Sequence, residues 1–118
     1  MTSRELAKIA VAGLEDKKAD DIRIIDISEV SVMADYFIIA SADSTPQVQA
    51  LMDNVEEKMH EQDYYLKRVE GTKNSGWVLM DFGDVVVHIF NREDRLFYDL
   101  ERIWSDGKVI DPAELTQE

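Results

Sequence analysis

Residues Trp77–Phe90, WVLMDFGDVVVHIF, consist of two apolar runs separated by Gly83 and Asp84. Glycine at the first central position of a two-residue turn favours a type II′ β-hairpin. A turn of this length also fixes the pairing of the strands, so that Phe82 faces Val85 and the other pairs follow outward. We therefore predict an antiparallel strand pair whose register is set by the turn.

The two faces of this hairpin differ in chemistry. Side chains alternate across a strand, so one face carries only apolar residues, which are Val78, Met80, Phe82, Val85, Val87 and Ile89. We predict that this face belongs to the core. The opposite face mixes aromatic rings with a carboxylate and an imidazole, and its residues are Trp77, Leu79, Asp81, Val86, His88 and Phe90. That face is predicted to be a second packed layer, a binding surface with aromatic anchors, or both at once.

Helices are predicted on both sides of this hairpin. Thr2 and Glu5 have the spacing of a capping box, and apolar residues at helical spacing follow them. A second helix over residues 45–62 begins after the hydroxyl cap Ser44, with Pro46 in its first turn. A third helix is predicted over residues 91–104, directly after the hairpin.

The remaining apolar runs predict further strands, at Ile22–Ile27, Tyr36–Ser41 and Tyr64–Val69. The order α-β-β-α-β-β-β-α predicts an α/β (mixed α+β) fold, with a single mixed sheet of about five strands flanked by helices. We assign residues 1–104 to one domain. Residues 105–118 form a polar C-terminal tail, which we expect to be mobile.

The charge balance limits the kinds of partner. The 118 residues include 13 Lys and Arg against 25 Asp and Glu, a formal charge of −12, and no Cys. This excess of acid argues against direct binding of nucleic acid, because phosphates are held by clustered basic side chains. An acidic protein is attracted to basic proteins instead. The sequence shows no signal or transit peptide and no membrane-spanning run, so we expect a cytoplasmic protein with no membrane partner.

No pattern typical of catalysis or of cofactor binding is present. The two histidines, His60 and His88, lie on different predicted elements and do not have the spacing of metal ligands. No serine lies in a G-x-S-x-G context, and no glycine-rich nucleotide loop occurs. Asp35 precedes a buried strand, where we expect its carboxylate to accept backbone N–H bonds. We therefore expect no catalytic residue, no metal ion and no cofactor.

Several segments combine, in order and at compatible spacing, into a family pattern. They are Ala34–Ser41 (ADYFIIAS), Gly76–Asp81 (GWVLMD), Gly83–His88 (GDVVVH) and Arg95–Trp104 (RLFYDLERIW). Together they resemble the ribosomal silencing factor family, also called RsfS, YbeB or iojap. The G-x-V-x-V-H strand followed by R-x-x-Y-x-L-E-x-x-W is the most specific part of this resemblance.

The resemblance implies a nucleotidyltransferase-like fold, a tendency to form homodimers, and binding to the large ribosomal subunit through ribosomal protein L-fourteen. The bound factor is expected to block joining of the small subunit, so that translation falls when nutrients are scarce. No catalysis is implied. The Gly-Ser pair and the D-x-D carboxylates of nucleotidyltransferases are both absent from this chain.

The residue patterns and the family resemblance both point to the hairpin as the partner-binding site. The predicted contact residues are Trp77, Leu79, His88 and Phe90 as anchors, Arg95 and Tyr98 as an extension, and Asp81 and Glu101 as acceptors for Arg or Lys of the partner. Two alternatives remain at this point. One is a nucleotidyltransferase-like enzyme, and the other is a plain dimerisation module whose aromatic face pairs with a second copy.

Overall fold

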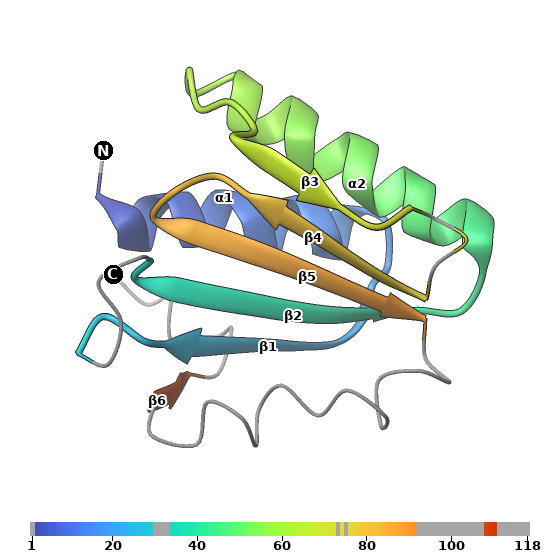
Figure 1. The fold of residues 1–118 in the computed structure, drawn as a ribbon, viewed down its shortest axis with the longest axis horizontal. Helices are drawn as coiled ribbons and strands as arrows, with labels where there is room; N and C mark the ends of the chain where they lie inside the picture. Colours follow the sequence, from blue (N-terminus) through green and yellow to red (C-terminus); the bar gives the residue numbers. More distant parts are fainter. Residues whose placement is uncertain (1, 30–33, 73, 75, 92–107, 111–118) are drawn as a thin grey trace.

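One mixed sheet organises the protein. The computed structural model describes residues 2–29, 34–72, 74, 76–91 and 108–110. Within them, six strands lie in the order β3-β4-β5-β2-β1-β6 (Figure 1). The strands are β1 (Asp20–Asp26), β2 (Tyr36–Ala42), β3 (Arg68–Glu70), β4 (Trp77–Asp81), β5 (Val85–Asn91) and β6 (Lys108–Ile110). β2 and β5 pair in parallel, and the other neighbours pair antiparallel. The predicted single mixed sheet is confirmed.

Two helices cover one face of this sheet, α1 (Ser3–Asp16) and α2 (Thr45–His60) (Figure 1). α1 begins with the predicted capping box, because Glu5 N–H donates to Thr2 Oγ1 at 3.2 Å and Thr2 N–H donates to Glu5 Oε2 at 3.1 Å. α2 begins at its predicted cap, where Ser44 Oγ accepts from Gln47 N–H at 3.2 Å. Neither helix is long and apolar enough to cross a membrane.

The main core lies between the two helices and the sheet. All six residues predicted for the apolar face of the hairpin are buried there, with Phe82 the most exposed at 2%. They pack with apolar side chains of both helices, including Leu6, Leu14, Leu51 and Val55. The predicted core face of the hairpin is therefore confirmed.

The strand predicted over Tyr64–Val69 is wrong for residues 64–67. Tyr64 N–H donates to Met59 O at 3.0 Å, and Asp63 has a φ of +62°. This is the geometry of a Schellman motif, which ends α2 and uses the backbone of Tyr64 to satisfy a helix carbonyl. The strand, β3, therefore begins only at Arg68.

Part of the predicted polar tail belongs to the sheet. β6 pairs antiparallel with β1, with Ile24 opposite Ile110 and Ile25 opposite Val109. The expectation of a mobile tail over 105–118 is therefore wrong for residues 108–110. Three residues are too short a run for a recognisable alternation, and their partner strand is distant in the sequence. The rest of that tail, and the helix predicted over 91–104 apart from Asn91 in β5, lie outside the described residues.

The hairpin turn provides a test of the fold. Gly83 has a φ of +97°, and a Cβ added there would lie 2.9 Å from Lys67 Nζ. We predict that Gly83→Ala lowers the free energy of unfolding by about 1–3 kcal/mol, because alanine is strained at this φ. Urea denaturation measures the loss.

The matched control is Asp84→Ala in the same turn. Asp84 acts through its backbone carbonyl, which accepts from Asp35 N–H at 2.8 Å and survives the substitution. We expect this variant to lie within about 0.5 kcal/mol of the wild type. If Gly83→Ala and Asp84→Ala lowered the free energy of unfolding equally, strain at the φ of Gly83 would not be the cause.

Candidate functional site

The face of the hairpin that points away from α1 and α2 carries the predicted contact residues. β4 and β5 pair in the predicted register, with Trp77 opposite Phe90, Leu79 opposite His88 and Asp81 opposite Val86. The structure therefore brings together all the predicted site residues that lie on the hairpin. We call Trp77, Leu79, Asp81, Val86, His88 and Phe90 the aromatic face.

Burial divides the aromatic face by strand. On β5, His88 is 2% exposed and Phe90 is 1% exposed, so both side chains lie in the interior. On β4, Trp77, Leu79 and Asp81 are half-buried. Among these five residues, the β4 side chains are therefore more exposed than those of β5.

A hydrogen bond joins the two strands across this face. Trp77 Nε1–H donates to His88 Nδ1 at 3.1 Å. The two ring planes differ by only 11°, and a hydrogen bond between ring nitrogens lies close to the plane of both rings, so the rings lie side by side. The ring of Phe90 is parallel to that of Trp77 within 3°, with centroids 5.9 Å apart. The rings of Phe37 and His88 are in an edge-to-face contact, with centroids 4.8 Å apart and planes at 61°.

The imidazole of His88 is neutral in this environment. Burial removes water from the charged form and lowers the pKa of His88 from 6.5 to about 4. Because Nδ1 accepts a hydrogen bond from Trp77, the ring proton must be on Nε2. Nε2 is buried and has no hydrogen-bond partner within the described part of the chain.

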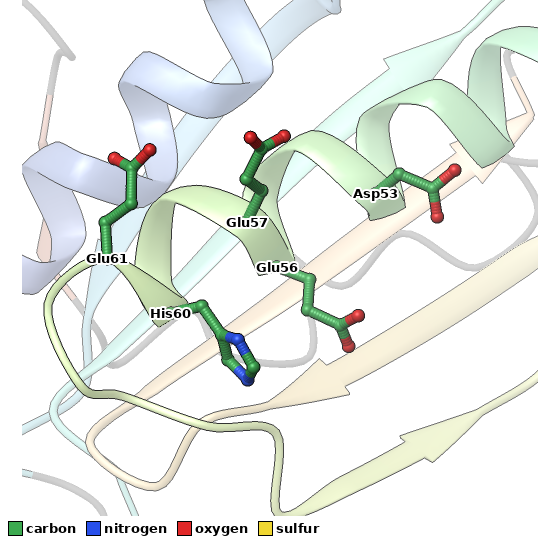
Figure 2. A pocket seen from close by; sticks show the side chains of 5 residues that line it. All are labelled: Asp53, Glu56, Glu57, His60 and Glu61. Carbon is green, nitrogen blue, oxygen red and sulfur yellow. The ribbon is translucent and has the colours of Figure 1, made fainter.

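The other histidine lies elsewhere, on α2. His60 contacts the ring of Tyr65 edge-on, with centroids 4.2 Å apart. It lines a shallow surface pocket together with Asp53, Glu56, Glu57 and Glu61 (Figure 2). The carboxylates around this pocket point in different directions rather than toward a common centre (Figure 2). Among the residues the structure describes, no three His, Asp or Glu side chains are placed to hold a metal ion.

The aspartates near the sheet have local structural roles. Asp26 Oδ1 accepts from the backbone N–H and the hydroxyl of Ser28, at 3.0 and 2.6 Å. Asp81 Oδ1 accepts from Gly83 N–H at 2.8 Å and so supports the hairpin turn. Asp35 bonds through its backbone, since its carbonyl accepts from Ile27 N–H at 2.8 Å. These contacts give the carboxylates of Asp26 and Asp81 structural roles at the ends of β1 and β4.

Comparison with known proteins identifies the family. Residues 1–118 match the family described as ribosomal silencing factor during starvation. The chain belongs to this family. It is 40% identical over 111 residues to the ribosomal silencing factor RsfS of Bacillus subtilis, and the match covers 94% of each chain.

Two further proteins extend the comparison of this silencing factor family. A crystal structure of a protein from Chromobacterium violaceum has a TM-score of 0.85 and 38% identity, and the match covers 89% of this chain and 88% of that one. A mouse protein named mitochondrial assembly of ribosomal large subunit protein 1 is 33% identical over 100 residues, which is 80% of this chain and 43% of the mouse protein.

Sequence reasoning missed two residues of β2 that lie beside the aromatic face, on the same side of the sheet. Phe37 and Ile39 of β2 lie next to Val86 and His88 of β5 in the parallel register, and both belong to the cluster on this side of the sheet. Their alternation was visible in the sequence, but only the pairing of β2 with β5 reveals which face they share. The predicted contact residues Arg95, Tyr98 and Glu101 lie outside the described residues.

The burial of His88 predicts how stability depends on pH. Between the unfolded pKa of 6.5 and the folded pKa of about 4, the unfolded chain binds a proton that the folded chain excludes. Stability therefore falls as the pH drops through this window, by about 2–3 kcal/mol between pH 7 and about pH 4.5 from this group alone.

Comparison of the wild type with His88→Asn isolates the contribution of His88 to the pH dependence of stability. The carboxylates titrate in both proteins, so their effect cancels. Urea unfolding at several pH values measures it. We expect the wild type to lose about 2–3 kcal/mol more than the variant on acidification. If the free energies of unfolding of the wild type and His88→Asn changed equally with pH, His88 would not be buried in its neutral form.

Proposed function

We propose that this protein binds the large ribosomal subunit through ribosomal protein L-fourteen, blocks joining of the small subunit, and lowers translation when nutrients are limiting. The match to the silencing factor family over residues 1–118 carries this proposal. The name of the mouse relative, which refers to the large ribosomal subunit, supports the choice of subunit. In this proposal the protein acts in the cytoplasm, without catalysis or a cofactor, and is a homodimer when free.

We place the contact on the β4 side of the aromatic face. Trp77, Leu79 and Asp81 are alternate residues of one strand and share one face of it. Trp is one of the residue types most enriched in interface hot spots, and Leu79 and Asp81 lie on the same face of the strand. His88 and Phe90 lie too deep for extensive contact and support these side chains from β5. Arg95, Tyr98 and Glu101 would extend the same contact.

The charge of the chain fits a basic protein partner. Ribosomal proteins are typically basic, and a chain with a formal charge of −12 is attracted to them before contact is made. In the cell this attraction is screened beyond about 8–10 Å, so it speeds encounter more than it holds the complex. Within the complex, the carboxylate of Asp81 is placed to accept from an Arg or Lys of the partner.

Binding and its consequence are tested with purified ribosomal subunits. Co-sedimentation should recover the protein with large subunits and not with small ones. Light scattering after the two subunits are mixed should rise more slowly when the protein is present. Absence of binding to large subunits at low salt would contradict the proposed function.

The location of the contact is tested by substitution. Trp77→Ala should weaken binding to the large subunit at least tenfold, which corresponds to about 1.4 kcal/mol, because it removes the largest side chain of the proposed contact. Tyr65→Ala is the matched control, since Tyr65 is also aromatic and is 54% exposed but lies beside His60 at the end of α2. Wild-type affinity in a folded Trp77→Ala variant would show that the contact lies on another face.

A further inference from the structure

The indole N–H of Trp77 is already used within the protein. It donates to His88 Nδ1 across the strand pair at 3.1 Å. An indole has this one donor and no acceptor nitrogen. A partner that contacts Trp77 therefore meets the faces and edges of its ring, unless the bond to His88 is first broken.

His88 is well placed to hold this bond. Its side chain is 2% exposed, its strand is paired with β4 on one side and with β2 on the other, and Phe37 contacts its ring. The acceptor nitrogen therefore occupies a fixed position. A neutral imidazole with its proton on Nε2 offers Nδ1 permanently as an acceptor.

Trp77 lies less deep in the protein than His88. It is the first residue of β4, directly after Gly76, whose φ is +84°, and its side chain is half-buried. A large side chain in such a position loses rotamer freedom when a partner binds, and a side chain already held in its bound orientation loses less. A fixed Trp77 ring is therefore a preorganised contact.

From this geometry we propose that His88 positions Trp77 for partner binding, and that Trp77 offers the partner its ring rather than its N–H group. The inference rests on the proposed function, because it concerns how the same face recognises the ribosomal protein. An Arg or Lys side chain of the partner fits the face of the Trp77 ring beside the carboxylate of Asp81. The formal charge of −12 on the chain also favours a cation. Its stem would pack on the indole and its cation would lie near Asp81.

Two substitutions at His88 separate positioning from simple packing. His88→Asn keeps an acceptor oxygen close to the position of Nδ1, whereas His88→Leu fills the space without an acceptor. Ile39→Val is the control for loss of packing, because Ile39 of β2 lies opposite His88 of β5 and is buried on the same side of the sheet. Circular dichroism establishes that each variant is folded before binding is measured.

The hydrogen bond itself is read by NMR. The resonance of the Trp77 indole N–H is assigned as the one lost in Trp77→Phe. In the wild type we expect this proton to be shifted downfield and to exchange slowly with water. His88→Leu should remove both properties, while His88→Asn should keep both. A resonance that His88→Leu leaves unchanged would overturn the inference, whether or not ribosomal subunits are bound.

Binding to purified large subunits tests the role of the bond. We expect His88→Leu to weaken binding at least fivefold, and His88→Asn and Ile39→Val to stay within twofold of the wild type. In a Trp77→Phe background, which has no N–H to hold, His88→Leu should cause no more than a twofold further loss.

The outcomes for this inference and for the proposed function are distinct. Suppose that the wild type binds and that His88→Leu binds equally well or more tightly. Binding then does not depend on the hydrogen bond between Trp77 and His88, or the partner uses the Trp77 N–H. Either result overturns the inference. If the wild type itself does not bind large subunits, the proposed function fails, and the NMR measurement still decides whether His88 holds Trp77.

Discussion

The carbonyl oxygen of Asp84 connects the hairpin turn to the rest of the sheet. It accepts hydrogen bonds from Asp35 N–H at 2.8 Å and from Tyr36 N–H at 3.2 Å, at the point where β2 begins. These bonds set the parallel register in which Tyr36 lies opposite Val85. Because side chains alternate along each strand, this register decides which residues of β2 and β5 share a face. A shift by one residue would exchange the core side chains with those of the aromatic face.

The fixed register gives the two faces of the hairpin different surroundings. One face is covered by α1 and α2 and forms the main core. The other face carries a second cluster, in which His88 and Phe90 are buried on β5 while Trp77 remains half-buried on β4. The proposed recognition surface is therefore built on a rigid strand pair, which keeps its orientation before a partner arrives.

Local signals in the sequence predicted the local structure well. Gly83 and Asp84 predicted the hairpin register, and Thr2 and Ser44 predicted the starts of both helices, because turns and caps depend on neighbouring residues. The strand predicted from Tyr64 started too early, because the motif that ends α2 uses the backbone there. β6 was missed because its three residues form a strand only by pairing with β1.

The candidate site could be predicted only in part, because some of its contacts depend on strands that are distant in the sequence. Alternation placed Trp77 and His88 on one face, since that follows from the hairpin alone. The hydrogen bond between them and the deep burial of His88 also depend on β2, whose Phe37 contacts the imidazole. The sequence does not reveal that β2 lies next to β5, so it does not distinguish a buried supporting histidine from an exposed contact residue.

In the proposed complex, the β4 side of the aromatic face contacts the large ribosomal subunit. The most direct test is a structure of the complex between this protein and purified large subunits, determined by electron cryo-microscopy. We predict that Trp77, Leu79 and Asp81 face a protein of the subunit, with an Arg or Lys of that protein on the Trp77 ring. We also predict that the acidic pocket on α2 is left open. A complex in which α2 is docked and β4 faces solvent would contradict this placement of the contact.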